Sequence, residues 1–211
     1  MPRNREAIAA GASAIVLAGG RSARMGRPKA MLRIGASTLI ERTAGELLRA
    51  FDDVVVVAAP ETEGIALPAL GAAAILRDSE AYRGPAEALA RGLRAARHDV
   101  AFACSCDLPM LRAEVARRLI ALIDDFDAVI PRVGNRLQLL HAVYRRRCAD
   151  ALDAMSARGE RRLGALLEEI TARVIDEAEY RRADPEALSC FNINTPGDYA
   201  RATRMERDAR R

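Results

Sequence analysis

The chain alternates short apolar runs with longer stretches in which apolar residues recur every three or four positions. The short runs have the length of buried strands, and they cover residues 14–17, 54–59, 72–76, 99–106, 128–131 and 139–144. Three stretches with helical periodicity lie among them, at residues 38–50, 86–96 and 112–123. This alternation predicts an α/β fold with a mainly parallel sheet between layers of helices.

The second half of the chain carries weaker signals. We expect two short helical stretches at residues 150–157 and 163–170, a strand at 171–175 and a short extended segment at 191–196. Pro196 then opens a last helix, at a position that proline favours. Earlier in the chain, Ser37 is placed as the N-cap of the helix at 38–50.

Neither a linker nor an internal repeat interrupts this pattern. We therefore predict one domain over residues 1–211, a length that allows a full hydrophobic core. Residues 1–12 and 206–211 are expected to form flexible tails, and the second of these ends is mostly charged.

The composition narrows the possible functions. Basic residues outnumber acidic ones by 33 to 29, and the two kinds are mixed along the chain, which indicates a solvated surface that attracts small anions. Aromatic residues make up 4% of the chain, so no stacking platform for nucleic acid is expected. The chain lacks the roughly 20-residue apolar run of a membrane span and the apolar core of a signal peptide. We expect a cytoplasmic protein that binds neither nucleic acid nor membranes.

The four cysteines agree with a reducing compartment, since none of them forms a Cys-x-x-Cys pair. Cys104 and Cys106 alternate along the expected strand at 99–106, and we interpret both as small core residues. The alternative, a metal–thiolate site, lacks a second pair of ligands.

The first strand ends in a loop that is suited to phosphate. Gly19, Gly20 and Gly26 leave backbone amides uncovered, and four cations follow within this loop: Arg21, Arg24, Arg27 and Lys29. At the carboxyl end of a first parallel strand, such a loop is expected to hold a polyphosphate.

Lys29 is the only lysine of the chain. Every other basic residue is arginine, so a lysine at this place indicates a need for a compact ammonium group rather than a planar guanidinium. The alternative is that its identity is due to chance.

Two aspartates follow the expected strands. Asp107 comes directly after the run at 99–106 and precedes Pro109, and a carboxylate at a strand end is a candidate ligand for Mg²⁺. Asp78 follows the run at 72–76. For both residues the alternative is an ordinary turn or a helix cap.

Three polar residues near the end of the sheet are further candidates. Asn192 and Asn194 flank Ile193 in an extended segment, so their side chains point to the same face, which we assign to the site rather than to the core. His141 lies in an apolar strand, where the alternative is a hydrogen-bonded core histidine.

The loop sequence Leu-Ala-Gly-Gly-x-Ser-x-Arg-Met-Gly-x-x-Lys at residues 17–29 resembles the signature of nucleotidyltransferases, and most of all that of the molybdenum cofactor guanylyltransferases. The resemblance extends to residues 84–85, 138–144 and 192–196. It implies a Rossmann-like three-layer sandwich of the nucleotide-diphospho-sugar transferase type. The activity that it implies is transfer of GMP from GTP to the phosphate of molybdopterin, with Mg²⁺ as cofactor and Asp107 as its ligand.

The resemblance also assigns roles to single residues. Those implied in catalysis are Arg24, Lys29 and Asp107. Those implied in nucleotide binding are Leu17, Ala18, Gly19, Gly20, Lys29, Asp78 and Asp107, and those on the acceptor side are His141, Asn192 and Asn194. Proteins that deliver or receive the cofactor, molybdoenzymes among them, are implied as partners.

The chain departs from the family pattern at two places. Val57 stands where the family commonly has an asparagine that helps to read guanine, and Glu87 and Ala88 follow Gly84-Pro85 where Leu-Ala-Gly is usual. These changes leave open a cytidylyltransferase of the same cofactor, although its loop usually reads Leu-Ala-Ala-Gly. They also leave open a sugar-phosphate or isoprenoid-precursor nucleotidyltransferase, and a non-catalytic protein that binds a nucleotide or carries the cofactor.

Overall fold

A central sheet organises the protein, whose computed structural model describes residues 11–19, 28–59, 69–77 and 84–209. Its strands lie in the order β10-β7-β9-β6-β1-β4-β5, and β8 pairs with β7. In chain order the strands are β1 (Ala12–Ala18), β4 (Val54–Ala58), β5 (Ala74–Arg77), β6 (Val100–Ser105), β7 (Ala128–Val133), β8 (Arg136–Leu137), β9 (His141–Arg145) and β10 (Ala172–Ile175).

Most neighbouring strands run parallel, as predicted. The exceptions are β9, which is antiparallel to both β6 and β7, and β8, which is antiparallel to β7. A tight turn joins β7 to β8 and explains the reversal, because Gly134 adopts a φ of 58° there. The sheet is therefore mixed around β9 and parallel from β6 to β5.

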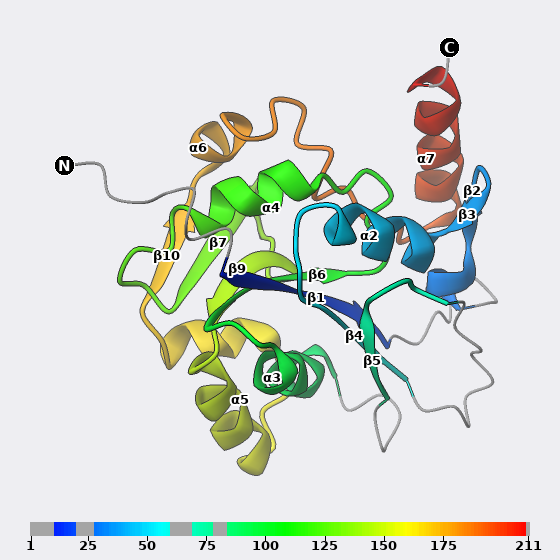
Figure 1. The fold of residues 1–211 in the computed structure, drawn as a ribbon. Coiled ribbons are helices and arrows are strands. Elements are labelled where there is room, and N and C mark those ends of the chain that lie inside the picture. Colours follow the sequence, from blue (N-terminus) through cyan, green and yellow to red (C-terminus); the bar gives the residue numbers. More distant parts are fainter. Residues whose placement is uncertain (1–10, 20–27, 60–68, 78–83, 210–211) are drawn as a thin grey trace.

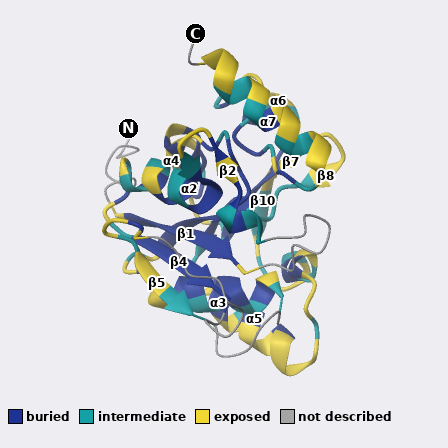
Figure 2. Ribbon diagram, turned by 90° about the vertical axis from the view of Figure 1, so that its right-hand side faces the viewer, coloured by how far each residue is buried: buried dark blue, intermediate teal, exposed yellow. Residues whose placement is uncertain are grey.

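Helices cover both faces of the sheet, which confirms the predicted three layers (Figure 1). The helices α2 (Leu39–Leu48) and α4 (Ala113–Ile120) pack on one face, and α3 (Pro85–Ala95) and α5 (Cys148–Ala157) pack on the other. The strands between them are buried, as Figure 2 shows for β1 and β4. Alternation along β1 divides the core: Val16 faces the α2 layer, whereas Ile15 faces the α3 layer.

Helix α3 lies very close to the sheet. A Cβ atom built on Gly92, in the middle of α3, would stand 2.6 Å from Cγ2 of Ile15 and 3.3 Å from Cγ2 of Val57. A residue without a side chain is therefore required at this contact between α3 and the strands β1 and β4.

The last helix, α7 (Pro196–Ala209), packs beside a small hairpin that comes early in the chain (Figure 1). The hairpin consists of β2 (Arg33–Ile34) and β3 (Ser37–Thr38), and it follows a single 3-10 turn, η1 (Lys29–Met31). A separate apolar cluster joins the two parts, and its fully buried members include Leu32, Ile193 and Ala202.

The start of α2 corrects one prediction. Thr38, not Ser37, is the N-cap, because its Oγ1 accepts the amide of Glu41 while the Glu41 side chain accepts the amide of Thr38. Ser37 instead pairs with Ile34 in the hairpin.

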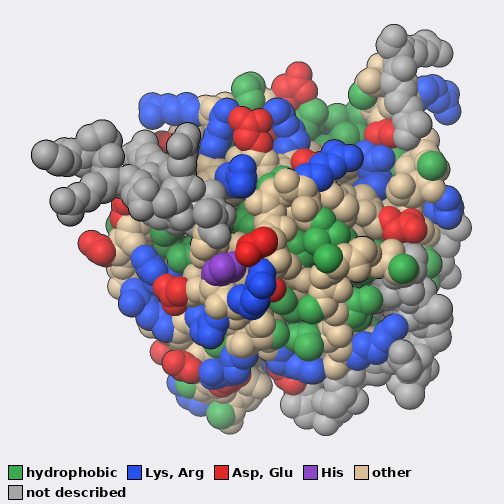
Figure 3. Space-filling model, viewed as in Figure 1, with side chains coloured by type: hydrophobic (Ala, Val, Ile, Leu, Met, Phe, Trp, Pro, Cys, Tyr) green, Lys and Arg blue, Asp and Glu red, His purple; other side chains and the backbone are tan. Residues whose placement is uncertain are grey.

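Other elements differ from their predicted form. The stretch at 163–170 is a 3-10 helix, η3 (Leu163–Glu168), and the short helix α6 (Glu177–Arg181) was not predicted. Ala12, expected in a flexible tail, begins β1, and residues 206–209 continue α7. Across the described ranges, no helix is both long and apolar enough to cross a membrane. On the face seen in Figure 3, basic and acidic side chains are mixed.

Candidate active site

The carboxyl ends of β1 and β6 meet at the centre of the sheet. From β1 the chain first builds outward through β4 and β5, and then returns to place β6 on the other side of β1. A reversal of strand order of this kind marks the part of the carboxyl edge where α/β sheets bind ligands, and we call this part of the edge the crevice. The amide of Cys106 donates to the carbonyl of Leu17 at 3.1 Å, which joins the two strand ends.

Three predicted residues come together at this crevice. The Lys29 ammonium donates to Oδ2 of Asp107 at 2.8 Å and to Oδ1 of Asn194 at 2.9 Å. The Lys29 and Asp107 side chains are 23% and 12% exposed, so their ion pair is open to a ligand but shielded from most solvent. The sequence had pointed to all three residues without placing them in contact.

Different elements position these three side chains. Lys29 begins the 3-10 turn η1, Asp107 follows β6, and Asn194 precedes α7. The amide of Ile193 donates to the Asp107 carbonyl at 3.0 Å and holds the Asn194 segment beside the Asp107 loop.

A cap at the start of α7 fixes the backbone of Asn194. Its amide donates to Oδ2 of Asp198 at 3.0 Å, and Asp198 also accepts the amide and the hydroxyl of Thr195. The hydrogen bond from the Asn194 amide, with those from Thr195, holds the pKa of Asp198 below its ordinary value, so this carboxylate stays charged.

The two asparagines share one face, as their spacing predicts. Asn194 Nδ2 donates to Oδ1 of Asn192 at 3.1 Å. This bond orients the Asn194 amide so that its oxygen faces Lys29. Asn192 and Asn194 therefore extend the polar surface of the crevice beyond Asp107.

Ser105 was not predicted from the sequence. Its hydroxyl donates to Oδ1 of Asp107 at 2.6 Å, so each oxygen of the carboxylate has a partner. The signal was available, because a residue two positions before Asp107 at a strand end faces the same side.

The donor set suits a hard cation. Asp107 is only 8% exposed and supplies a carboxylate, Ser105 places a hydroxyl oxygen against it, and the Asn194 amide oxygen contacts the same Lys29 ammonium. Mg²⁺ prefers oxygen ligands and retains several waters, so one carboxylate and the substrate phosphates are sufficient. Among the residues with described positions, no cluster of three His, Cys, Asp or Glu side chains offers a complete protein cage.

His141 does not join this group. It is 1% exposed, its Nε2 lies 2.9 Å from the Tyr180 hydroxyl, and its ring packs edge-on against Phe102. Burial lowers the pKa of His141 to about 3, so the imidazole is neutral. This placement corrects the expectation of a residue that faces the acceptor, and it matches the alternative of a hydrogen-bonded core histidine.

Cys104 and Cys106 are buried free thiols, which confirms them as core residues. Burial, reinforced by the charge of Asp107, raises the pKa of Cys106 to about 12 and also raises that of Cys104. Both thiols therefore stay protonated and are poor metal ligands.

The remaining nucleotide-side predictions divide into two groups. Leu17, Ala18 and Gly19 lie at the carboxyl end of β1, on the edge of the crevice. The positions predicted at Gly20, Arg24 and Asp78 lie outside the described residues. Val57 is 1% exposed and packs in the α3 layer, so its side chain is not available to a ligand.

The chain matches a known family along most of its length. Residues 14–174 match the family model described as the MobA-like NTP transferase domain. A protein named probable molybdenum cofactor guanylyltransferase from Pelotomaculum thermopropionicum is 30% identical over 199 residues, which cover 94% of this chain and 95% of that protein. A molybdenum cofactor guanylyltransferase from Desulfosudis oleivorans is 34% identical, over 89% of this chain and 92% of that protein.

A solved structure has the same fold. The crystal structure of molybdopterin-guanine dinucleotide biosynthesis protein A from Archaeoglobus fulgidus aligns with a TM-score of 0.81 at 26% identity, and the alignment covers 93% of this chain and 99% of that one. The shared fold is the arrangement of layers and strands that places the Lys29, Asp107 and Asn194 side chains at one crevice in this chain.

Proposed function

Because the chain belongs to the family of the MobA-like NTP transferase domain, we propose that it transfers GMP from GTP to the phosphate of molybdopterin. The names of the two relatives support this activity. The observation that carries the proposal is the contact of Lys29 with Asp107 and Asn194 at the reversal of strand order. That contact brings a cation, a carboxylate and an amide to the place where a nucleotide is expected.

The reaction forms one phosphoanhydride bond and breaks another. An oxygen of the molybdopterin phosphate attacks the α-phosphorus of GTP, the bond from that phosphorus to the β-phosphate bridging oxygen breaks, and pyrophosphate leaves with the bond electrons. Negative charge accumulates around the α-phosphate and the leaving group, so catalysis requires fixed positive charge and aligned reactants.

Lys29 is proposed to stabilise this charge. A compact ammonium group can approach the α-phosphate closely, and Asn194 already holds the group at the crevice at 2.9 Å. The family resemblance assigns the phosphate tail to Arg24 and the backbone of Gly19 and Gly20, and a nucleotide contact to Asp78.

Asp107 would hold Mg²⁺, with Ser105 supporting its carboxylate. When bound, the metal supplies neutralisation of the triphosphate. The protein contributes the direction of that carboxylate, because the Ser105 hydroxyl fixes Oδ1 and the Ile193 amide fixes the Asp107 backbone.

Asn192 and Asn194 are proposed to contact the acceptor. They lie together on the segment that borders the Asp107 loop, and amide groups can both donate to and accept from a pterin or its phosphate. His141 is left out of this assignment because it is buried.

The proposal predicts the effect of Asp107→Asn, which keeps the size of the side chain and removes its charge. We expect turnover to fall on the order of 100-fold or more, because the metal ligand is lost. Steady-state assays with GTP, molybdopterin and varied Mg²⁺ measure the change, and circular dichroism verifies the fold. Activity with an unchanged dependence on Mg²⁺ would show that Asp107 is not the ligand.

A further inference from the structure

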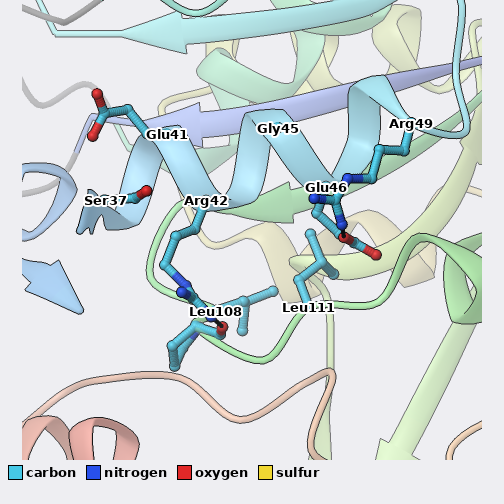
Figure 4. A pocket seen from close by; sticks show the side chains of 9 residues that line it. Ser37, Glu41, Arg42, Gly45, Glu46, Arg49, Leu108 and Leu111 are labelled. Carbon is cyan, nitrogen blue, oxygen red and sulfur yellow. Dashed lines mark hydrogen bonds and ion pairs between the residues drawn. The ribbon is translucent and has the colours of Figure 1, made fainter. Parts of the chain in front are cut away.

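A polar pocket lies beside the Asp107 loop. Its volume is about 270 Å³, and it is lined by helix α2 with the adjoining Arg49 and by Leu108, Pro109 and Leu111. Figure 4 shows Arg42 pointing from α2 toward Leu108 at one end, and Arg49 beside Glu46 at the other end. The two arginines thus occupy the same helical stretch and the same pocket, with different partners.

Arg42 joins three elements. Its Nη2 donates to the Pro109 carbonyl at 3.3 Å and to Oε2 of Glu206, on α7, at 2.8 Å. The Arg42 and Glu206 side chains are 24% and 15% exposed, so solvent and salt screen this pair only partly. The Nε atom of Arg42 is buried and has no hydrogen-bond partner among the described residues. Arg42 therefore bonds to the Pro109 loop and to α7 through Nη2, while its Nε donor is left unsatisfied within the described ranges.

The Arg49–Glu46 pair is different. Its atoms are 3.1 Å apart, the Arg49 side chain is 81% exposed, and both residues belong to the same stretch of chain. An exposed pair of this kind contributes little to stability. Arg49 therefore provides a matched control for a loss of positive charge from this face.

The Arg42 contacts give α7 a second attachment to the Asp107 loop. On one side, the Ile193 amide binds the Asp107 carbonyl, and the segment continues through Asn194 into α7. On the other side, Glu206 near the end of α7 binds Arg42, which binds the carbonyl of Pro109, two residues after Asp107. Helix α7 is therefore attached to the Asp107 loop at both of its ends.

We propose that Arg42 is a positioning residue that fixes Asn194 relative to Asp107 by tying α7 to the Asp107 loop. Its role in the reaction rests on the proposed function, in which the asparagines contact the acceptor and Asp107 lies on the nucleotide side. Loss of the tie should let α7 and the segment at 192–195 shift away from the loop. Acceptor binding should then suffer more than GTP binding, because Asn194 moves with α7 whereas the end of β1 does not.

The test compares Arg42→Met with Arg49→Met in the full-length protein. For Arg42→Met we expect KM for molybdopterin to rise about tenfold, as is typical when a partly buried charge-assisted bond is lost, and KM for GTP to change less than about twofold. Arg49→Met should change neither value by more than about twofold. Equal changes in both KM values, or no change relative to Arg49→Met, would overturn the proposal.

Hydrogen exchange supplies a readout that needs no activity. The backbone amides of residues 192–195 and 197–198 should exchange faster in Arg42→Met than in the wild type, while those of β1 and β4 should not change. If the protein were inactive with every nucleotide, faster exchange would still support the tie, and the proposed function alone would fail. Unchanged exchange would overturn the tie, whatever the activity.

Glu206→Gln covers the case in which Arg42→Met folds poorly. It weakens the α7 end of the tie and leaves the Arg42–Pro109 contact in place. We expect KM for molybdopterin to rise again without a matching rise in KM for GTP, but by less than in Arg42→Met. A fall in thermal stability without that rise would mean that the pair is structural only, and would contradict the proposal.

Discussion

At the scale of single residues, Lys29 lies between two oxygen atoms that a divalent cation would also approach. Its ammonium is 2.8 Å from Oδ2 of Asp107 and 2.9 Å from Oδ1 of Asn194. In the absence of nucleotide, Lys29 therefore neutralises the proposed metal ligand. With GTP bound, the same ammonium should serve the phosphate instead.

This double role predicts effects of opposite sign for Lys29→Met. Without nucleotide, the variant should bind Mn²⁺ about fivefold to tenfold more tightly, because a partly buried competing cation is gone. In the presence of a non-hydrolysable GTP analogue, it should bind the metal–nucleotide complex more weakly. Electron paramagnetic resonance of free Mn²⁺ measures both affinities.

Ser105→Ala is the control for that experiment, because it removes the other partner of the Asp107 carboxylate without changing charge. It should not strengthen Mn²⁺ binding in the absence of nucleotide. Weaker metal binding by Lys29→Met under both conditions would show that Lys29 does not compete with the metal.

His141 predicts a pH dependence of stability. Its pKa is about 3 in the folded protein and about 6.5 when exposed in the unfolded chain, so the unfolded state binds more protons below pH 6.5. Stability that is present above pH 6.5 is therefore lost progressively as the pH falls toward 3. Between pH 7.5 and 5.5 the loss should be on the order of 1 kcal/mol, before most carboxylates titrate.

Urea unfolding of the wild type and His141→Gln at these two pH values measures the effect. His141→Gln should remove most of the pH dependence, whatever its own stability. An equal slope in the wild type and His141→Gln would assign the acid sensitivity to other groups.

Site residues could be predicted from the sequence where the residue type or its position in the pattern is unusual for this chain. Lys29 stood out as the only lysine, Asp107 stood out at the end of an apolar strand, and Asn194 stood out because it shares one face of an extended segment with Asn192. Arg42 was not selected, because arginine is common here and its role depends on a contact with the distant Glu206. Ser105 was not selected, although it lies only two positions before Asp107. His141 was ambiguous because an apolar strand can present its polar residue to a core partner such as Tyr180.

At the scale of elements, the packing of α3 on the sheet depends on Gly92. Gly92→Ala should reduce the free energy of unfolding by about 1–3 kcal/mol, since its Cβ would stand 2.6 Å from a stiff, β-branched Ile15 side chain. Thermal and urea unfolding measure the loss.

Gly45→Ala is the matched control. Gly45 is also inside a helix, α2, but a Cβ atom there would meet nothing within 4 Å. Its replacement should stabilise the protein by up to about 1 kcal/mol through helix propensity. If both variants gained or lost stability equally, the close contact of α3 with β1 would not be what requires glycine.

Long periodic elements were predicted well and short ones poorly. The strands β1, β4 and β6 and the helices α2 and α3 fall within a few residues of their predicted ranges. The two-residue strands β2 and β3 are too short to show any periodicity. The direction of β9 could not be predicted either, because it depends on the turn after β7 and on pairing with β6 rather than on the residues of β9.

At the scale of the whole molecule, the site draws on both halves of the chain. Lys29 and Asn194 are separated by 165 positions, and the helix that follows Asn194 packs on the hairpin after Lys29. These contacts support our proposal that residues 1–211 form one domain. They also explain why Lys29 and Asn194 could be selected from the sequence as candidates, whereas their contact could not be predicted.

Base selection also belongs to the whole molecule. Position 57 is a valine that is buried in the core. No side-chain amide at this position can therefore read guanine. Selectivity must then come from other groups, among them the backbone at the end of β1. We expect GTP to be preferred by less than about 10⁴-fold, the level typical of dedicated hydrogen-bond recognition.

The mass of the product tests the proposed function most directly. The purified protein is incubated with molybdopterin, Mg²⁺ and each of the four nucleoside triphosphates in turn. We predict that GTP yields molybdopterin guanine dinucleotide and pyrophosphate, and that the other three nucleotides yield far less product. A larger yield of the cytosine dinucleotide from CTP, or no dinucleotide from any nucleotide, would contradict the proposed function.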